Sequence, residues 1–192
     1  MKRFIGIPAI LAAVVLGGFR PADTPRKVEN FKLKDYNGVE HSLTDYKDAK
    51  GVVLMFIATR CPISNSYNER MVALDKDYRS KGIVFIGINA NKQEPVDEVK
   101  QHAKDKGFEF TILKDEGNVI ADKLGASVTP EIYLLNPGFE VLYHGRIDDS
   151  SKEAKVTSQD LRRALDEFLA GKVVSTPETK AFGCTIKRVT AS

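Results

Sequence analysis

The sequence predicts an α/β fold with a central mixed β-sheet flanked by helices. Two continuous apolar runs rich in β-branched residues, 52–57 and 83–88, have the length and composition of strands buried on both faces. Between them, Met71, Leu74 and Tyr78 recur at helical spacing. A strand, a helix and a strand joined in this way form a parallel βαβ unit, which is the centre of the predicted domain.

The first residues have the pattern of a secretory signal peptide, because Lys2 and Arg3 precede a mostly apolar run over residues 4–16. This run is shorter than the roughly 20 residues of a membrane span. We expect residues 1–18 to be the signal, and an uncleaved signal would act as an N-terminal membrane anchor. The prediction is therefore an exported protein, either periplasmic or extracellular.

The rest of the chain is predicted to form one domain. Residues 19–26 contain two prolines and are expected to be a linker, followed by the domain over residues 27–171 and a tail over residues 172–192. The net charge of +3 on 192 residues gives no electrostatic reason to expect a nucleic-acid partner. We predict no cofactor.

The elements around the βαβ unit follow from turn and capping signals. An N-terminal β-hairpin is predicted over residues 30–42, where Asn37 and Gly38 favour a tight turn. A helix is expected to run from Pro62 to about Ser80. Further elements are expected at 95–107 (helix), 110–113 (strand), 118–124 (helix), 131–135 (strand) and 141–147 (strand).

The last predicted helix has the clearest amphipathic pattern in the chain. Thr157 and Asp160 fit a capping box at its start, and Gly171 fits its end. Its apolar face is predicted to consist of Leu161, Ala164, Leu165, Phe168 and Leu169. The tail that follows shows neither a helical nor a strand period.

Cys61 lies between the first buried strand and Pro62, a residue that suits the first position of a helix. We therefore place Cys61 at the helix N-cap, where unpaired backbone N–H groups and the helix dipole stabilise a thiolate. Such an environment lowers the pKa of a cysteine below its ordinary value of about 8.5. The pattern indicates a redox or nucleophilic site, and the alternative is a small apolar residue that only starts the helix.

The order of these elements resembles the thioredoxin fold, and the chain is similar to exported redoxins of the AhpC/TSA and TlpA-like group. The resemblance covers about residues 27–171, and it is carried by the sequences ATRCPIS at 58–64, VTPE at 128–131 and HGRIDD at 144–149. It implies a thiol oxidoreductase whose partners are protein or small-molecule thiols and disulfides, with peroxides as a further option. It also implies that Pro130, preceded by Thr129, is cis and lies against Cys61, where it helps to dock an incoming backbone.

Two residues depart from the thioredoxin pattern. Ser64 stands where the motif C-x-x-C has its second cysteine, and Met55 stands where thioredoxins have a buried acid. The Ser64 hydroxyl is expected either to donate a hydrogen bond to the thiolate or to be a polar residue of the first helical turn. Because no local thiol can release a mixed disulfide, we predict that Cys184 is the resolving partner of Cys61. The rival arrangement is a disordered tail in which Cys184 pairs with another protein or with a second copy of this chain.

The peroxiredoxin pattern P-x-x-x-T-x-x-C is also incomplete, because Leu54 and Ala58 occupy its proline and threonine positions. We therefore expect Cys61 to react more slowly with peroxide than with disulfides. A peroxiredoxin-type peroxidase is kept as the alternative function.

Two charged residues in the matching segments have two interpretations each. Glu131 would lie beside Cys61 as a proton relay, or it would be a solvent-facing strand start. Arg146 would place a guanidinium near the thiolate, or it would pair at the surface with Asp148 or Asp149.

Copper handling is kept as an alternative function of a different class. Cys61, Cys184 and His144 are residue types that bind copper, but no C-x-x-C or H-x-x-x-H spacing groups them. We therefore predict no metal site. A further alternative is a non-catalytic binding module whose two cysteines form a structural disulfide.

Overall fold

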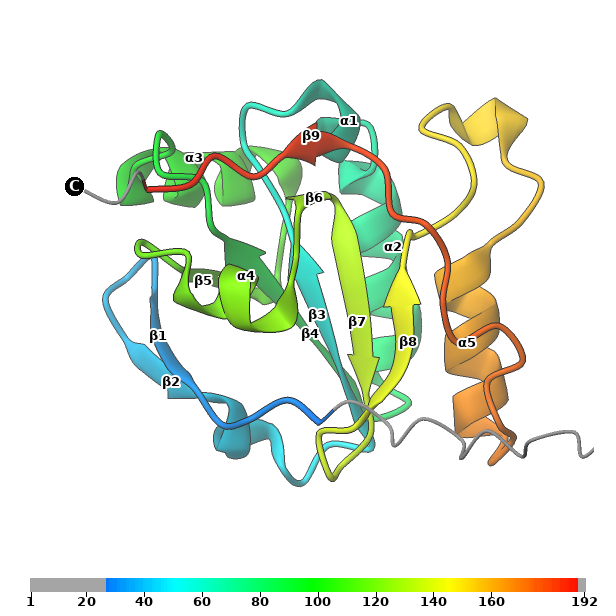
Figure 1. Ribbon diagram of the computed structural model, residues 1–192. Coiled ribbons are helices and arrows are strands. Elements are labelled where there is room, and N and C mark those ends of the chain that lie inside the picture. Colours follow the sequence, from blue (N-terminus) through cyan, green and yellow to red (C-terminus); the bar gives the residue numbers. More distant parts are fainter. Residues whose placement is uncertain (1–26, 190–192) are drawn as a thin grey trace, which may run out of the picture.

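The computed structural model describes residues 27–189 and contains one mixed seven-stranded sheet with helices on both faces (Figure 1). The strand order is β2-β1-β5-β4-β3-β7-β8. These strands are β1 (Lys32–Asp35), β2 (Glu40–Ser42), β3 (Gly51–Phe56), β4 (Ile83–Asn89), β5 (Thr111–Lys114), β7 (Glu131–Leu135) and β8 (Val141–Gly145). The strands β3, β4 and β5 are parallel, and all other pairs are antiparallel. The predicted fold class, including the N-terminal hairpin, is confirmed.

Five α-helices and a second small sheet complete the described part. The helices are α1 (Pro62–Asn65), α2 (Asn68–Arg79), α3 (Val96–Lys106), α4 (Val119–Leu124) and α5 (Asp160–Leu169), with 3-10 turns at Leu43–Tyr46 and Glu153–Lys155. The second sheet pairs β6 (Val128–Thr129) with β9 (Cys184–Thr185). The predicted signal peptide and linker lie outside the described residues. Within residues 27–189, no helix has the length and hydropathy that a membrane span requires.

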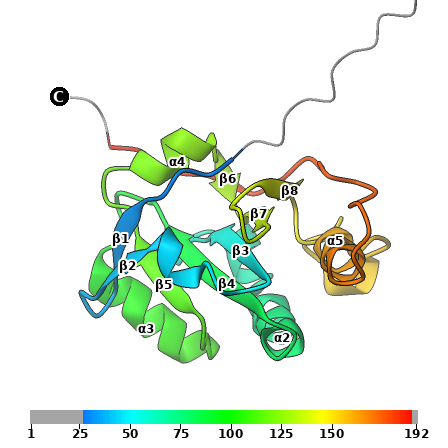
Figure 2. The ribbon, with the colours of Figure 1, turned by 90° about the horizontal axis from the view of Figure 1, so that it is seen from below.

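Strand β3 is buried along its whole length because helices cover both faces of the sheet. Figure 2 shows α2, α3 and α5 on one side and α4 on the other. Val53 and Met55 belong to the core under α2, α3 and α5, whereas Val52, Leu54 and Phe56 belong to the core under α4. This alternation follows from the two-residue period of a strand.

The helix predicted from Pro62 to Ser80 is divided into α1 and α2. At the junction, the Ser66 hydroxyl donates a hydrogen bond to the Ile63 carbonyl at 2.7 Å, and the Tyr67 N–H donates to the Ser64 carbonyl. Local side-chain bonds of this kind compete with the helical ladder, which interrupts the helix here. The apolar stripe of Met71, Leu74 and Tyr78 is buried as predicted.

The predicted capping box at the start of α5 is wrong. The N-cap residue of α5 is Gln159, which makes no side-chain capping hydrogen bond, and the Thr157 N–H donates to Asp149 at 2.9 Å. Asp160 is the first residue of α5, and its carboxylate accepts from Arg146 Nε at 2.7 Å and from Arg163 at 2.6 Å. Ion pairs therefore use the carboxylate that a capping box would need.

The segment after α5 crosses the domain instead of leaving it. In Figure 1 it passes over α1 and β6 as the red end of the chain. Strand β9 pairs antiparallel with β6, in the register Val128 to Thr185 and Thr129 to Cys184. This pairing places Cys184 at the carboxyl end of β3, where Cys61 lies.

Candidate active site

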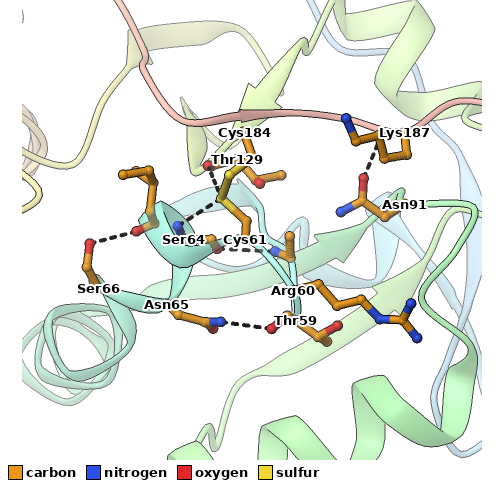
Figure 3. Close-up of a disulfide and its surroundings, with 12 residues drawn as sticks. Thr59, Arg60, Cys61, Ser64, Asn65, Ser66, Asn91, Thr129, Cys184 and Lys187 are labelled. Atoms are coloured by element: carbon orange, nitrogen blue, oxygen red, sulfur yellow. Dashed lines mark hydrogen bonds between the residues drawn. A yellow bond between two sulfur atoms is a disulfide. The ribbon is translucent and has the colours of Figure 1, made fainter.

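Cys61 and Cys184 form a disulfide across the upper edge of the sheet (Figure 3). Their Cα atoms are 5.8 Å apart, and 123 positions separate them in the sequence. Cys61 is the N-cap of α1 with extended backbone angles, and Pro62 is the first helical residue, as predicted. The predicted pairing of the two cysteines is confirmed within one chain.

The backbone of α1 holds the sulfur of Cys61. The Ser64 N–H donates a hydrogen bond to Cys61 Sγ at 3.2 Å, which is the N-cap interaction expected at a helix start. The Ser64 hydroxyl accepts from the Ala58 N–H at 3.2 Å, and the side chain is buried. The donor to the sulfur is therefore the backbone of Ser64. After reduction the same N–H would stabilise a thiolate. The lowered pKa of the reduced Cys61 stays a prediction.

The loop before β7 forms the opposite wall of the site. The peptide bond between Thr129 and Pro130 is cis, as the resemblance implied. Cys61 Sγ lies 3.4 Å from the Thr129 carbonyl oxygen, which would accept a hydrogen bond from the thiol after reduction. Thr129 is 2 % exposed, and its buried hydroxyl oxygen has no hydrogen-bond partner among residues 27–189. Thr129 and Pro130 thus lie beside the disulfide, where they were predicted.

The tail is fixed to the domain before Cys184. The His144 N–H donates to the Pro177 carbonyl, and the Thr179 N–H donates to the His144 carbonyl, both at 2.9 Å. The ring of Phe182 packs edge-on against Tyr67, with centroids 6.3 Å apart. These contacts hold the segment that leads into β9.

The tail is also fixed after Cys184. Ile186 is 3 % exposed and packs in the core under α4. The Lys187 N–H donates to the Asn91 side chain, as Figure 3 shows, and the Val189 N–H donates to the Asn118 side chain, both at 2.7 Å. Two buried asparagines therefore bind the backbone of the tail, and the sequence analysis did not single out either of them.

Gly183 is required for the close approach of the tail to the loop. A Cβ atom at this position would lie 1.9 Å from the Thr129 carbonyl oxygen. We expect Gly183→Ala to force β9 away from β6 and to prevent most of the Cys61–Cys184 disulfide from forming, because two backbones would have to separate. Mass spectrometry of the alkylated protein in a glutathione redox buffer measures the disulfide fraction. Val173→Ala, at a position 91 % exposed in the same tail, is the matched control, and equal disulfide fractions in both variants would contradict this role of Gly183.

Glu94 lies behind the residues that precede Cys61, and the sequence did not predict this position for it. It is 1 % exposed, and its carboxylate accepts hydrogen bonds from the Thr59 N–H at 2.9 Å and the Arg60 N–H at 3.1 Å. The side-chain amides of Asn89 and Asn91 also donate to it, at 2.6 and 3.1 Å. A buried carboxylate therefore fixes the two residues that precede Cys61.

Lys114 extends this buried network to β5. Its ammonium donates to the Asn89 side-chain oxygen at 2.7 Å and to the Asn91 carbonyl at 2.8 Å. Burial lowers the pKa of Lys114, and the nearby Glu94 carboxylate opposes this shift. A signal for the network was present in the sequence, because Asn89, Asn91 and Glu94 follow a buried strand. Side chains at the carboxyl ends of neighbouring parallel strands meet at one edge of the sheet.

Glu131 supports the loop at the cis-proline. It is 3 % exposed, so the alternative of a solvent-facing strand start is wrong. Its carboxylate accepts from the Ser127 N–H at 2.8 Å and the Val128 N–H at 3.1 Å, and it lies 2.7 Å from His144 Nε2. Within the described part of the chain, the Glu131 carboxylate contacts the loop and His144, and it makes no hydrogen bond to Cys61. The relay role of Glu131 stays a prediction.

The Glu131 carboxylate should make stability depend on acid pH. Burial acts to raise its pKa, but the hydrogen bonds from His144, Ser127 and Val128 outweigh burial and hold the pKa below its ordinary value of 4.5. A lowered pKa stabilises the fold above about pH 4.5, and this contribution is lost as the pH falls through the folded-state value. We expect Glu131→Gln to be less stable at pH 7 and to lose less stability between pH 5 and 3, as measured by urea unfolding.

Glu178 offers a control for this prediction. Its side chain is 78 % exposed and lies 3.9 Å from the same histidine. Glu178→Gln should therefore unfold with the pH profile of the unmodified protein. If Glu131→Gln also kept that profile, Glu131 would not be the cause of the stability lost at acid pH.

Arg146 has a structural partner. Its Nε donates to Asp160 at the start of α5, so the expected pairing with Asp148 or Asp149 is wrong. Asp148 instead accepts from Arg70 and from the Tyr67 hydroxyl. Among the contacts of the described residues, none joins Arg146 to Cys61.

The remaining expectations concern the strand before Cys61 and metals. Met55 is fully buried in the core under α2. Within residues 27–189, no three His, Cys, Asp or Glu side chains are grouped so that they would hold a metal ion.

The relatives that match the sequence include two proteins called thiol-disulfide oxidoreductase ResA. The protein from Halalkalibacterium halodurans is 32% identical over 113 residues, which are 59% of this chain and 62% of the relative. The protein from Geobacillus thermodenitrificans is 30% identical over 144 residues, which are 72% of this chain and 74% of the relative. The first match thus spans less than two thirds of that relative's length.

Solved structures share the fold. A hypothetical protein from Sinorhizobium meliloti 1021 superposes with a TM-score of 0.82 at 31% identity, covering 90% of this chain and 98% of the other. The thioredoxin domain of a thiol-disulfide oxidoreductase from Bacteroides vulgatus has a TM-score of 0.56 at 16% identity, covering 65% of this chain and 89% of the other. The predicted thioredoxin-like fold is confirmed.

The model of the AhpC/TSA family matches residues 25–144, which include Cys61, the cis-proline loop and Glu94. Together with the ResA relatives, this match confirms the prediction of a thiol oxidoreductase. The chain belongs to the AhpC/TSA family.

Proposed function

We propose that this protein is an exported thiol–disulfide oxidoreductase in which Cys61 and Cys184 form the redox pair. The observation that carries the proposal is the disulfide between the N-cap of α1 and strand β9. The name of the ResA relatives supports the same reaction. The signal-like residues 1–18 support an exported protein of the periplasm or the extracellular space.

The reaction transfers two electrons between this pair and an outside pair of sulfurs. When an outside dithiol reduces the protein, the Cys61–Cys184 bond breaks, the dithiol becomes a disulfide, and both protein sulfurs are released as thiol or thiolate. In the opposite direction, the reduced pair breaks a substrate disulfide and returns to the oxidised form. Protein and small-molecule thiols and disulfides are the proposed partners.

The neighbouring residues are proposed to support this exchange. Pro62 and Ser64 set the first turn of α1, which presents an N–H group to the Cys61 sulfur. Thr129 and Pro130 form the loop that pairs with β9 and holds Cys184 against Cys61. The Glu131 carboxylate fixes this loop by accepting hydrogen bonds from the Ser127 and Val128 N–H groups.

Reduction of a disulfide-bonded model protein such as insulin, with dithiothreitol as the electron source, tests the function. We expect turnover by the unmodified protein and none by Cys61→Ser or Cys184→Ser, because each variant lacks half of the redox pair. Circular dichroism must show that both variants are folded. Full turnover by a folded Cys61→Ser variant would contradict the proposal.

Reactivity with peroxide separates this proposal from the alternative of a peroxidase. Ala58 and Leu54 stand at two positions of the peroxiredoxin pattern, and both side chains are buried. We expect the reduced protein to react more slowly with hydrogen peroxide than with oxidised glutathione. Stopped-flow measurement of thiol loss gives both rate constants. Fast, saturating turnover of peroxide would support a peroxidase instead.

A further inference from the structure

The two sulfurs of the disulfide have different surroundings. Cys61 is 4 % exposed, with the Ser64 N–H at 3.2 Å and the Thr129 carbonyl oxygen at 3.4 Å from its sulfur. Cys184 is only partly buried and belongs to β9, which lies on the outside of the domain in Figure 1. Figure 3 shows Cys184 on the crossing tail and Cys61 at the start of α1.

Access to the two cysteines differs. The attacking sulfur must reach one disulfide sulfur from the side opposite to the sulfur that leaves. Cys61 is 4 % exposed, so the surrounding protein leaves little room for an outside thiol beside it. Cys184 is only partly buried, so an outside thiol reaches it more readily. Attack at Cys184 is therefore the less hindered of the two.

The leaving sulfur favours the same direction of attack. A sulfur leaves more readily when its thiolate is stabilised. The Cys61 sulfur accepts a hydrogen bond from the Ser64 N–H at 3.2 Å, and such a bond stabilises negative charge on the sulfur. Cys184 lies in a two-residue strand, and the structure gives its sulfur no comparable donor among the described residues. Attack on Cys184 releases the better leaving group.

We propose that outside thiols enter at Cys184, so that Cys184 carries the mixed disulfide and Cys61 is the leaving and resolving sulfur. The proposal rests on the proposed thiol–disulfide exchange. In the first step, an outside thiolate bonds to Cys184 Sγ, the Cys61–Cys184 bond breaks, and Cys61 leaves as a thiolate. A second thiol of the same reductant then displaces Cys184, and the reductant becomes a disulfide.

The reverse direction uses the same path. Cys184 of the reduced protein attacks a substrate disulfide, and Cys61 then attacks Cys184 to release the substrate as a thiol. This order is opposite to the one expected from the sequence, in which Cys61 takes the partner and Cys184 resolves. The difference arises because the tail covers Cys61, which the sequence alone does not reveal.

The test uses the oxidised full-length protein and reduced glutathione. The reaction is quenched with acid after seconds, free thiols are alkylated with N-ethylmaleimide at low pH, and the two cysteine peptides are quantified by mass spectrometry. We expect glutathione on Cys184 and N-ethylmaleimide on Cys61 in the same molecules, with at least about a tenfold excess over the opposite pattern. Glutathione mainly on Cys61, or equally on both, would overturn the proposal.

The same reaction in concentrated urea is the matched control. Unfolding exposes both sulfurs and removes the helix N-terminus, so the preference for Cys184 should disappear. A preference that persisted in urea would show that the fold is not its cause, and this would also overturn the proposal. If the folded protein kept its disulfide through long incubation with glutathione and with dithiothreitol, the proposed function itself would fail. That outcome is distinct from attack at the wrong sulfur.

Discussion

Reducing the disulfide is expected to lower the free energy of unfolding by about 5 kcal/mol in the chain-entropy model, because the bond closes a very long loop. The loop spans the 123 positions between Cys61 and Cys184. Without the bond, the unfolded chain regains the conformations that the closed loop excluded. Urea unfolding of the protein with and without a phosphine reductant measures the difference.

The variant Cys184→Ser provides the control for this measurement. It lacks the bond in either buffer, so the reductant should not change its unfolding midpoint. It should also unfold close to the reduced form of the unmodified protein. Coincident unfolding curves for the oxidised and reduced protein would show that the bond adds nothing to the stability of this fold.

Glu94→Ala is expected to lower the free energy of unfolding by about 3 to 5 kcal/mol, because buried donors would lose their acceptor. The donors are the N–H groups of Thr59 and Arg60 and the side-chain amides of Asn89 and Asn91. Water that enters the vacated space would satisfy only part of them. We also expect slower disulfide formation at Cys61, because the two residues before it would no longer be fixed.

Glu98→Ala is the matched control, because Glu98 contacts the same two residues from the surface. Its carboxylate pairs with Arg60 and accepts from the Thr59 hydroxyl, and the Arg60 side chain is 52% exposed. Exposed ion pairs of this kind contribute about 0 to 1 kcal/mol, so Glu98→Ala should be nearly neutral. Similar unfolding midpoints for the two variants would refute the special role of the buried carboxylate.

The sequence predicted the parts of this site that depend on neighbouring residues. Cys61 and Pro62 directly follow a buried strand, and a helix N-cap is determined within a few residues. The pairing with Cys184 was also predictable, because the chain has two cysteines and the nearer position is occupied by Ser64. The disulfide confirms that prediction.

Other features depend on contacts between distant segments, and the sequence did not reveal them. Glu94 reaches Thr59 from the loop after β4, which only the parallel pairing of β3 and β4 brings close. The tail has no strand period, yet it docks because the side chains of Asn91 and Asn118 bind its backbone. Backbone binding of this kind leaves no hydropathy pattern in the bound segment.

The anchoring of the tail on both sides of Cys184 also determines how long a mixed disulfide lasts. Hydrogen bonds at Thr179 and Lys187 hold the tail independently of the sulfur–sulfur bond. The two sulfurs therefore remain at a high effective concentration towards each other after reduction. An outside thiol must compete with this intramolecular partner at every encounter. We expect covalent intermediates with other proteins to be short-lived, and the protein to exchange electrons in pairs.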